Sequence, residues 1–330
     1  MITPSTGKIR AVVIGLGQVG MGYDLLLEDD YIYSHARAFA MHPEFELVGG
    51  VDPNAENCAV FVETFACPAY ADIGAALVAH EADVVTISVP TSYHQIVLME
   101  ILENSRPKAI LCEKPLSEDF GTAQEMVDAC ASKGVALYAN YIRRSEPGAI
   151  EVGRRITCGL IEAPLKGVVW YSKGLRHNGS HFLNLLEYWL GSVRDSSVIE
   201  PGRILHNGDA EPDLDITFER GRAVFLAARE ENFSYYTVEL VAANGRLRYE
   251  RGGARIEWEP IAKDSRLKGY TRLSELPEVI PSGMSRYQWH VADQLSAVLQ
   301  GRSAQLCTGT EALTTLNSIT SLISKPTHHA

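Results

Sequence analysis

Short apolar runs alternate with longer stretches of helical periodicity over residues 8–140. The apolar runs are rich in β-branched residues and predict strands at Ile9–Ile14, Glu46–Val51, Val84–Val89, Ala109–Cys112 and Val135–Ala139. Amphipathic stretches between them predict helices at Glu56–Phe65, Tyr93–Asn104 and Glu118–Lys133. We expect Ser117 to cap the last helix and Gly134 to end it in a left-handed conformation. This alternation is typical of a parallel sheet covered on both faces.

The pattern changes after residue 141. Helices are predicted at Gly148–Cys158, around an apolar face of Phe182, Leu185, Leu186, Trp189 and Leu190, and at Arg286–Gln300 and Thr310–Ser324. An apolar strand is expected at Leu165–Ser172. Short strand-like segments follow from residue 193 to residue 259, and Asn244-Gly245 is the strongest hairpin signal among their turns. The 330 residues therefore predict an α/β protein with an N-terminal domain over residues 1–141 and a C-terminal domain with a mostly antiparallel sheet over residues 142–330.

A glycine motif follows the first predicted strand without a gap and opens a predicted helix. In a Rossmann dinucleotide-binding domain, the first glycine of G-x-G-x-x-G permits a tight turn, and the second lets the backbone approach the pyrophosphate. The third lets the helix pack against the strand, and the N-terminus of that helix stabilises the phosphate charge. The motif therefore predicts cofactor binding by Gly15, Gly17, Gln18, Val19 and Gly20.

Asp52 ends the second predicted strand, where an acidic side chain binds the adenosine ribose hydroxyls and repels a 2′-phosphate. No arginine immediately follows it, so the sequence favours NAD over NADP. The distance from Gly15 to Asp52 exceeds the roughly 20 residues that the motif expects. The extra residues, Tyr23–Tyr33, form either a surface loop or a flap near the cofactor.

Charge and composition exclude several classes of partner. The chain has 30 Lys and Arg against 41 Asp and Glu, and its net charge of -11 repels nucleic acid and anionic lipid. Its six cysteines lie far apart without a C-x-x-C pair, a pattern that suits reduced thiols rather than zinc ligands or disulfides. The sequence contains neither a signal-peptide pattern nor an apolar run of about 20 residues. We therefore expect a cytoplasmic protein that binds no metal, nucleic acid or membrane.

Several short motifs, taken in order, resemble the glucose-fructose oxidoreductase, inositol dehydrogenase and rhizopine-catabolism family. Beyond the glycine motif they are Val51-Asp52, Ser88-Val89-Pro90-Thr91 with His94, Glu113-Lys114-Pro115, Asn140-Tyr141 with Arg143-Arg144, Gly179-Ser180-His181 and Gly309-Thr310-Glu311-Ala312-Leu313. The resemblance implies a Rossmann domain followed by an open-faced sheet used for oligomerisation, so we expect a homodimer or homotetramer. It also implies NAD(P)-linked oxidation or reduction of a sugar, nucleotide sugar, cyclitol or related polyol.

The resemblance also implies roles for individual residues. Lys114 matches the family's active-site lysine, and His181 matches the histidine of its Asp-x-Gly-x-His segment. His177 stands where the family has the aspartate; it either replaces that proton relay, binds a substrate anion or is an exposed loop histidine. Asn184 stands where an acid is often found. The remaining candidates are Pro90, Thr91, His94 and Glu113 for the cofactor, and Arg144, Lys173, Asn178 and Asn184 for the substrate.

The chemistry of alcohol oxidation agrees with these assignments. A base must remove the hydroxyl proton as hydride leaves the same carbon for the nicotinamide. Histidine, with an ordinary pKa of ~6.5, suits this task better than lysine at ~10.4. We therefore expect His181 to be the base and Lys114 to orient the hydroxyl and stabilise alkoxide charge. Two other hypotheses remain: a non-catalytic NAD-sensing regulator or scaffold, and an enzyme for an imine or keto acid bound by Arg143-Arg144.

Overall fold

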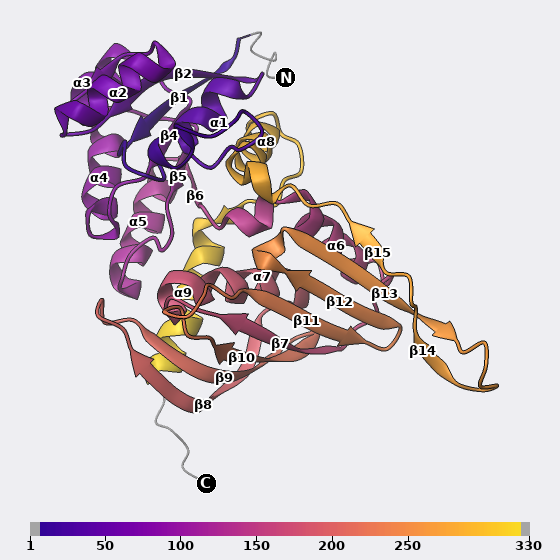
Figure 1. Ribbon diagram of the computed structural model, residues 1–330. Coiled ribbons are helices and arrows are strands. Elements are labelled where there is room, and N and C mark those ends of the chain that lie inside the picture. Colours follow the sequence, from indigo (N-terminus) through magenta and orange to yellow (C-terminus); the bar gives the residue numbers. More distant parts are fainter. Residues whose placement is uncertain (1–6, 325–330) are drawn as a thin grey trace. The chain divides into compact units, whose positions relative to one another are not determined.

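The computed structural model describes residues 7–324, which form two units (Figure 1). Within the described residues, the first unit contains residues 7–145 and Ser285–Thr314, and the second contains Glu146–Met284 and residues 315–324. The expected division had a single boundary after residue 141. The structure instead returns the chain to the first unit, because α8 (Tyr287–Leu299) packs against α1 (His35–Met41), and β16 (Cys307–Thr308) pairs with β6 (Ala136–Ala139).

The first unit contains the predicted Rossmann-type sheet. Within the described residues it has seven strands in the order β16-β6-β5-β4-β1-β2-β3, all parallel except β16. Five predicted strands are confirmed as β1 (Ile9–Ile14), β2 (Phe45–Val51), β4 (Val84–Ile87), β5 (Ala109–Cys112) and β6. The short β3 (Ala69–Tyr70) and α3 (Ile73–Ala79) had not been predicted, whereas the predicted helices are present as α2 (Ala55–Phe65), α4 (His94–Asn104) and α5 (Phe120–Ser132).

The start of α5 differs from the expectation. Asp119, not Ser117, caps the helix, because its carboxylate accepts a hydrogen bond from the Thr122 N–H at 2.9 Å. The Ser117 hydroxyl accepts one from the Asp119 N–H at 3.3 Å and so supports the capping residue. The predicted end is confirmed, since Gly134 has a φ of +68°.

The helix that follows the glycine motif is interrupted. Its first turn closes with a hydrogen bond from the Met21 N–H to the Gly17 carbonyl at 2.9 Å, and the chain then leaves through the 3-10 helix η1 (Gly22–Asp24). It returns at α1, where the His35 N–H donates to the Val19 carbonyl at 3.1 Å and the N–H of the next residue, Ala36, bonds to Gly20. The glycine motif is therefore followed by a turn and η1, and the α-helix expected directly after it begins only at His35.

The second unit contains the predicted, mostly antiparallel sheet. Its order is β14-β13-β12-β11-β7-β10-β9-β8, with β15 beside β13, and only β7 and β10 pair in parallel among the described strands. The strands are β7 (Leu165–Tyr171), β8 (Val193–Ile204), β9 (Ala210–Phe218), β10 (Gly221–Ala227), β11 (Thr237–Ala242), β12 (Gly245–Glu250), β13 (Arg255–Lys263), β14 (Thr271–Leu273) and β15 (Glu278–Ile280). The hairpin predicted at Asn244-Gly245 joins β11 to β12 and is confirmed.

One helix supplies much of the core of the second unit. The helices of this part are α6 (Pro147–Thr157), α7 (Ser180–Leu190) and α9 (Gly309–Ser324). The predicted apolar face of α7 is buried against the sheet: Phe182, Leu186 and Trp189 have no exposed surface and belong to one cluster with strand residues such as Val169 and Phe225. The core thereby fixes the N-terminus of α7, which carries a candidate site residue.

Candidate functional site

The three glycines of the motif occupy positions with different steric demands. Gly15 has a φ of +93°, and a Cβ there would lie 2.7 Å from the Ser88 backbone. A Cβ on Gly20 would lie 1.9 Å from the Gly15 carbonyl oxygen, whereas one on Gly17 would meet nothing within 4 Å. The first and third glycines are thus required by the packing of the protein itself. The open space at Gly17 fits the approach of a phosphate to the backbone.

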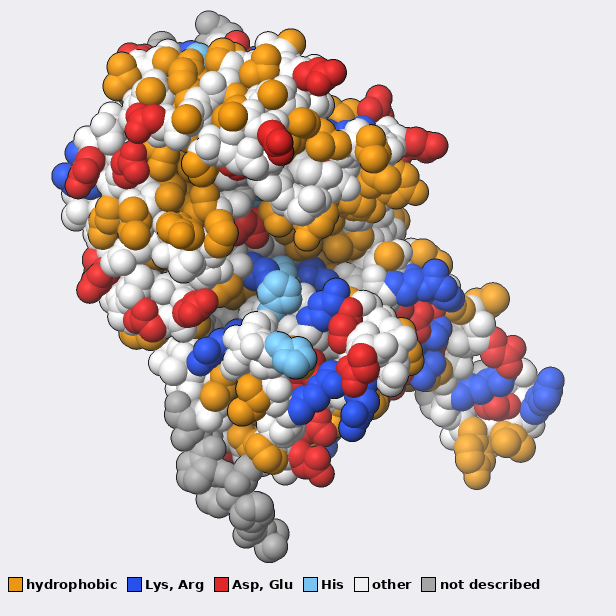
Figure 2. All heavy atoms as spheres, turned by 60° about the vertical axis from the view of Figure 1, so that its left-hand side comes forward, with side chains coloured by type: hydrophobic (Ala, Val, Ile, Leu, Met, Phe, Trp, Pro, Cys, Tyr) orange, Lys and Arg blue, Asp and Glu red, His pale blue; other side chains and the backbone are white. Residues whose placement is uncertain are grey.

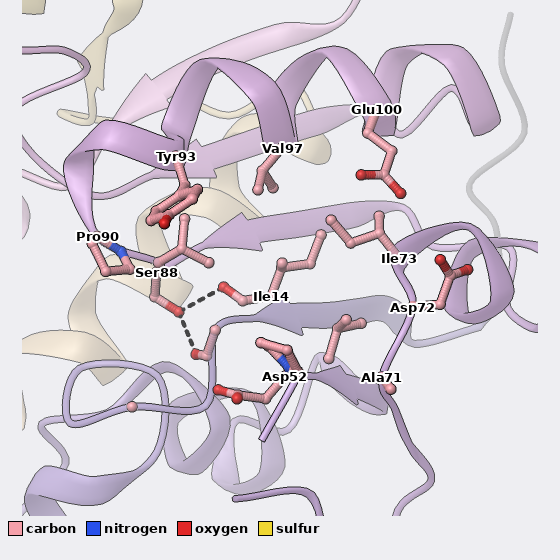
Figure 3. A pocket seen from close by; sticks show the side chains of 15 residues that line it. Ile14, Asp52, Ala71, Asp72, Ile73, Ser88, Pro90, Tyr93, Val97 and Glu100 are labelled. Carbon is pink, nitrogen blue, oxygen red and sulfur yellow. Dashed lines mark hydrogen bonds between the residues drawn. The ribbon is translucent and has the colours of Figure 1, made fainter. Parts of the chain in front are cut away.

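A groove of about 520 Å³ lies beside this motif, at the carboxyl ends of β1, β2 and β4. Figure 3 shows Asp52, Asp72 and Glu100 around it, together with apolar side chains that include Val97 and Ile73. Its lining is formed by Ile14, Gly15, Gly17, Val51, Asp52, Pro53, Ala71, Asp72, Ile73, Ser88, Val89, Pro90, Tyr93, Val97 and Glu100. Three carboxylates and no Lys or Arg stand among these described residues, so the groove disfavours additional negative charge.

Asp52 connects the end of β2 to the glycine motif. Its carboxylate accepts hydrogen bonds from the Leu16 N–H at 2.8 Å, the Asn54 N–H at 2.8 Å and the Asn57 side-chain amide at 3.2 Å. A carboxylate has about four acceptor positions, so these bonds leave capacity for a ligand hydroxyl. Asp52 is 8% exposed and lines the groove. It is both a structural acceptor and a candidate ribose ligand.

The other cofactor candidates occupy different environments. Pro90 lines the groove, whereas Thr91, which begins the 3-10 helix η2 (Thr91–Tyr93), is not among the lining residues. His94 is fully buried, with Nε2 3.0 Å from the Val89 carbonyl and Nδ1 3.1 Å from the Pro115 carbonyl. His94 therefore links the end of β4 to the Glu113-Lys114-Pro115 turn through these two contacts.

Glu113 belongs to a buried polar network that holds this turn. Its Oε1 accepts hydrogen bonds from His35 Nε2 at 2.8 Å and Asn140 Nδ2 at 2.6 Å. Gln288 contacts both partners, with its Oε1 3.2 Å from Asn140 Nδ2 and its Nε2 3.2 Å from the His35 ring. Burial raises the pKa of Glu113, but the hydrogen bond and charge of His35 and the Asn140 amide, with Lys114, hold it below its usual range. Lys114, partly exposed, directly follows this anchored residue.

Sequence reasoning had not found two members of this network. Asn140 belonged to a recognised motif, but His35 lies at the return of the insertion and Gln288 follows 148 residues after Asn140. No local pattern marks either residue as a partner of Glu113. For His35, the only signal in the sequence is its position two residues after Tyr33, at the end of the insertion.

The candidate substrate segment of the second unit joins β7 to α7 through an unusual backbone. Lys173 has a φ of +67° and Gly174 one of +85°, and the π-helix η4 (Leu175–Gly179) follows. The buried Asp209 accepts hydrogen bonds from the backbone N–H groups of Arg176 at 3.1 Å and His177 at 2.9 Å. Asp209 lies between β8 and β9, and sequence reasoning had not found it. Long-range contacts from this hairpin therefore shape the segment.

The predicted side chains of this segment have distinct partners. His181 lies in the first turn of α7 and is buried, whereas His177 is exposed. The Asn178 side-chain amide donates to the Tyr236 hydroxyl at 3.0 Å. Lys173 Nζ lies 2.9 Å from Glu230, which helps to raise the pKa of the lysine.

Two predicted substrate residues make internal contacts. The Asn184 side-chain amide is buried and donates to the Thr315 hydroxyl at 2.9 Å. Arg144 is also buried and donates to Glu311 at 2.6 Å, so a carboxylate of the protein balances its charge. The hypothesis of a keto acid bound by the arginine pair loses its main support.

Acidic and basic side chains are mixed on the surface. On the face drawn in Figure 2, Lys and Arg side chains lie among Asp and Glu side chains rather than in one continuous basic area. On the sheet of the second unit, for example, Arg248 pairs with both Glu257 and Glu259. No helix within residues 7–324 has the length and apolar character needed to cross a membrane. In the same residues, no three His, Cys, Asp or Glu side chains are grouped so that they could hold a metal ion.

The sheet, the glycine turn and the acidic end of β2 together define a Rossmann-type dinucleotide-binding protein. Residues 9–141 match the family model described as an oxidoreductase family with an NAD-binding Rossmann fold. This N-terminal region is thus similar to the glucose-fructose oxidoreductase, inositol dehydrogenase and rhizopine-catabolism family that the motifs of the chain resemble.

Individual relatives are distant. The chain is 24% identical over 286 residues to 2,7-anhydro-N-acetylneuraminate hydratase of Escherichia coli, an alignment that covers 79% of this chain and 72% of that protein. It is 28% identical over 248 residues to scyllo-inositol 2-dehydrogenase (NAD(+)) of Bacillus subtilis, covering 66% of each protein. The crystal structure of the WlbA dehydrogenase of Bordetella pertussis in complex with NADH and UDP-GlcNAcA has a TM-score of 0.72 at 17% identity, covering 97% of this chain and 96% of that one. At that identity the similarity shows the fold.

Proposed function

We propose that the protein is an NAD-dependent oxidoreductase that transfers hydride between nicotinamide and a secondary alcohol or ketone of a sugar, nucleotide sugar or cyclitol. The observation that carries this proposal is the turn at the carboxyl end of β5, where a buried hydrogen-bond network fixes Glu113. Lys114 follows Glu113 directly and so lies at the same edge of the sheet as the dinucleotide groove. Open α/β sheets bind their ligands at this edge. The match of residues 9–141 to the oxidoreductase family model and the dehydrogenases among the relatives support the same reaction class.

The residues of the groove fit NAD better than NADP. Gly15 and Gly17 would hold the pyrophosphate, and Asp52 would bind the adenosine ribose. Asp72 and Glu100 add negative charge to the lining, which would repel a 2′-phosphate. When bound, the cofactor supplies the nicotinamide ring that accepts or donates hydride.

The proposed mechanism assigns one role each to Lys114 and His181. The Lys114 ammonium orients the hydroxyl and stabilises the negative charge that develops on its oxygen. The His181 imidazole removes the hydroxyl proton in oxidation and returns it in reduction. Asp209 acts indirectly, by holding the backbone of the segment that leads into α7. His177 relays the proton towards solvent, a role that its exposure supports.

The cellular context of the proposal is a cytosolic homodimer or homotetramer. All six cysteines are free thiols in the structure, which supports a reducing compartment. The open sheet of the second unit is the proposed oligomerisation surface.

The test is replacement of Lys114 by alanine. We expect NADH affinity, measured by fluorescence titration, to stay within about threefold, and turnover to fall by at least about 100-fold. Lys108→Ala is the matched control, because Lys108 is a half-exposed lysine of the same unit that pairs with Asp83. Turnover would be followed with scyllo-inositol, 2,7-anhydro-N-acetylneuraminate and a UDP-linked amino sugar. Unchanged turnover in Lys114→Ala would contradict the assignment.

A second candidate function is an NAD-sensing regulator or scaffold. The observation that favours it is His177, an exposed imidazole where the family has an acidic relay residue. This candidate predicts NADH binding without turnover of any sugar, nucleotide sugar or cyclitol. The wild-type arm of the same experiment separates the two functions.

A further inference from the structure

The loop inserted after the glycine motif is held in its conformation by a buried aspartate. Asp24 is 1% exposed, and its carboxylate accepts hydrogen bonds from the Tyr33 N–H at 2.6 Å, the Ser34 N–H at 2.8 Å and the Ser34 hydroxyl at 2.6 Å. Arg37 of α1 donates to the Leu27 carbonyl at 3.0 Å. The two ends of the loop are therefore fixed to each other.

The loop is also fixed to α8. The Ile32 N–H donates to the Ser285 carbonyl at 3.0 Å, and the Gln288 N–H donates to the Ile32 carbonyl at 3.3 Å. Gln288 belongs to the network around Glu113. A segment outside the nucleotide-binding motif is thus coupled to the turn that carries Lys114.

The loop carries three tyrosines, Tyr23, Tyr31 and Tyr33, and α8 begins with a fourth, Tyr287; we name these four residues the tyrosine cluster. Tyr33 stacks on Tyr287 with ring centroids 5.0 Å apart, and Tyr31 lies 5.9 Å from Tyr33. Tyr33 and Tyr287 are partly buried, whereas Tyr23 and Tyr31 are 52% and 40% exposed. Two rings therefore form a packed base, and two present part of their surface to solvent.

The tyrosine cluster is linked to the anchored turn through Gln288, which directly follows Tyr287 and contacts Asn140 and His35 of the Glu113 network. Burial raises the pKa of Tyr287, and the charges of Glu113, Tyr23 and Tyr33 raise it further. Glu113 directly precedes Lys114 in the chain. The aromatic groups and the proposed reacting lysine thus occupy one neighbourhood of the first unit.

We propose that the tyrosine cluster is a substrate subsite for a sugar or cyclitol ring. Such a ring has an apolar C–H face and a rim of hydroxyls, which match the face of a tyrosine ring and its phenol group. Because Asp24 and α8 already fix the loop, little conformational entropy is lost when a ring binds. This inference rests on the proposed function and assigns part of its substrate recognition to the insertion.

The test measures equilibrium binding as well as turnover. Calorimetric titration of the NADH-saturated protein with scyllo-inositol, 2,7-anhydro-N-acetylneuraminate and a UDP-linked amino sugar would compare wild type with Tyr23→Ala and Tyr31→Ala. We expect at least about fivefold weaker binding of the accepted ring in each variant. The corresponding phenylalanine variants should retain most of the affinity, because they keep the aromatic face. Tyr270→Ala, at a 67% exposed tyrosine of the second unit, controls for loss of a surface tyrosine.

The outcomes separate this inference from the proposed function. If wild type binds and turns over a ring while both alanine variants match it within twofold, the subsite is overturned and the oxidoreductase proposal stands. Weakened NADH binding in the variants would make the cluster a cofactor contact, which also overturns the inference. If no ring binds to the NADH-loaded wild type, the substrate class itself is wrong and the subsite fails with it.

Discussion

The nucleotide groove of the first unit and the β7–α7 segment of the second reach their conformations by different routes. In the groove, the partners lie at the ends of two neighbouring strands of one βαβ unit: Gly15 turns the chain after β1, and Asp52, after β2, accepts a hydrogen bond from the Leu16 N–H at 2.8 Å. In the β7–α7 segment, the chain bends at Lys173, which has a positive φ although it is not a glycine. The carboxylate that accepts hydrogen bonds from the backbone of this segment, that of Asp209, comes from the β8–β9 hairpin.

The difference shows which parts of a site a short motif can encode. A motif can specify a turn whose partners lie on neighbouring strands of the same βαβ unit. It cannot specify a π-helix whose backbone N–H groups depend on a carboxylate from a separate hairpin. We therefore expect substitutions in the two regions to separate cofactor binding from substrate turnover.

The largest effect is expected for Gly20→Val. A Cβ at this position would lie 1.9 Å from the Gly15 carbonyl oxygen, and backbone atoms cannot yield to it as a flexible side chain would. The unfolding free energy of the first unit should fall by about 3 kcal/mol or more, with loss of NADH binding. Denaturant unfolding monitored by circular dichroism and an NADH titration would measure both effects.

Gly17→Ala is the matched control, because its Cβ would meet no protein atom within 4 Å. Its stability should stay within about 1 kcal/mol of wild type. NADH should nevertheless bind more weakly, since the added methyl group occupies the space proposed for the pyrophosphate. Equal stability of the Gly20 and Gly17 variants would refute the distinction between packing and ligand glycines.

A smaller effect is expected for Asp209→Asn in the second unit. The amide retains one acceptor for the two N–H groups of Arg176 and His177, so one of them loses its charged partner. This loss should cost about 1–3 kcal/mol and lower turnover at least about tenfold, while NADH affinity stays unchanged. Steady-state kinetics and NADH fluorescence would separate the two readouts. The control Asp195→Asn, at an exposed aspartate of β8, should change neither turnover nor NADH affinity. Loss of NADH binding in Asp209→Asn would contradict the separation of cofactor binding from substrate turnover.

The smallest effect is a pH-dependent one at Glu113. Its folded-state pKa lies below the usual value of 4.5, so the ionised carboxylate favours the folded state. This contribution is complete above pH 4.5 and disappears as the pH falls through the lowered folded-state pKa. Glu113→Gln should therefore cost about 1–2 kcal/mol at pH 7, and the gap to wild type should close in acid. Unfolding curves at several pH values would measure it, with the exposed Glu118→Gln as control. A gap that does not narrow as the pH is lowered would exclude ionisation as its cause.

The sequence predicts most of the secondary structure because period and length distinguish its elements well. The five strands of the βαβ region and the apolar face of α7 lie where the periodicity indicates. The short β3 and α3 are not predicted, because segments of two and seven residues are too short to show a clear hydrophobic periodicity. The cap of α5 was placed at Ser117 because serine and aspartate both cap helices, and only the backbone shows which one is positioned to do so.

The candidate site is predicted less completely than the fold. Motifs identify Asp52 and Lys114, but they do not reveal that His94 holds a turn or that Glu311 pairs with Arg144. These partners depend on which side chains the tertiary fold brings together from distant positions. Gln288 and His35, for example, are 253 residues apart in sequence and 3.2 Å apart in the structure.

The interrupted helix has a consequence for how such a site changes between relatives. The chain departs after Gly20 and returns at His35 with its hydrogen bonds directed to Val19 and Gly20, as if no residues intervened. The two ends of the inserted loop are therefore joined through the carbonyls of Val19 and Gly20. If the loop binds substrate as we propose, its residues can change substrate preference without a change in the glycine motif.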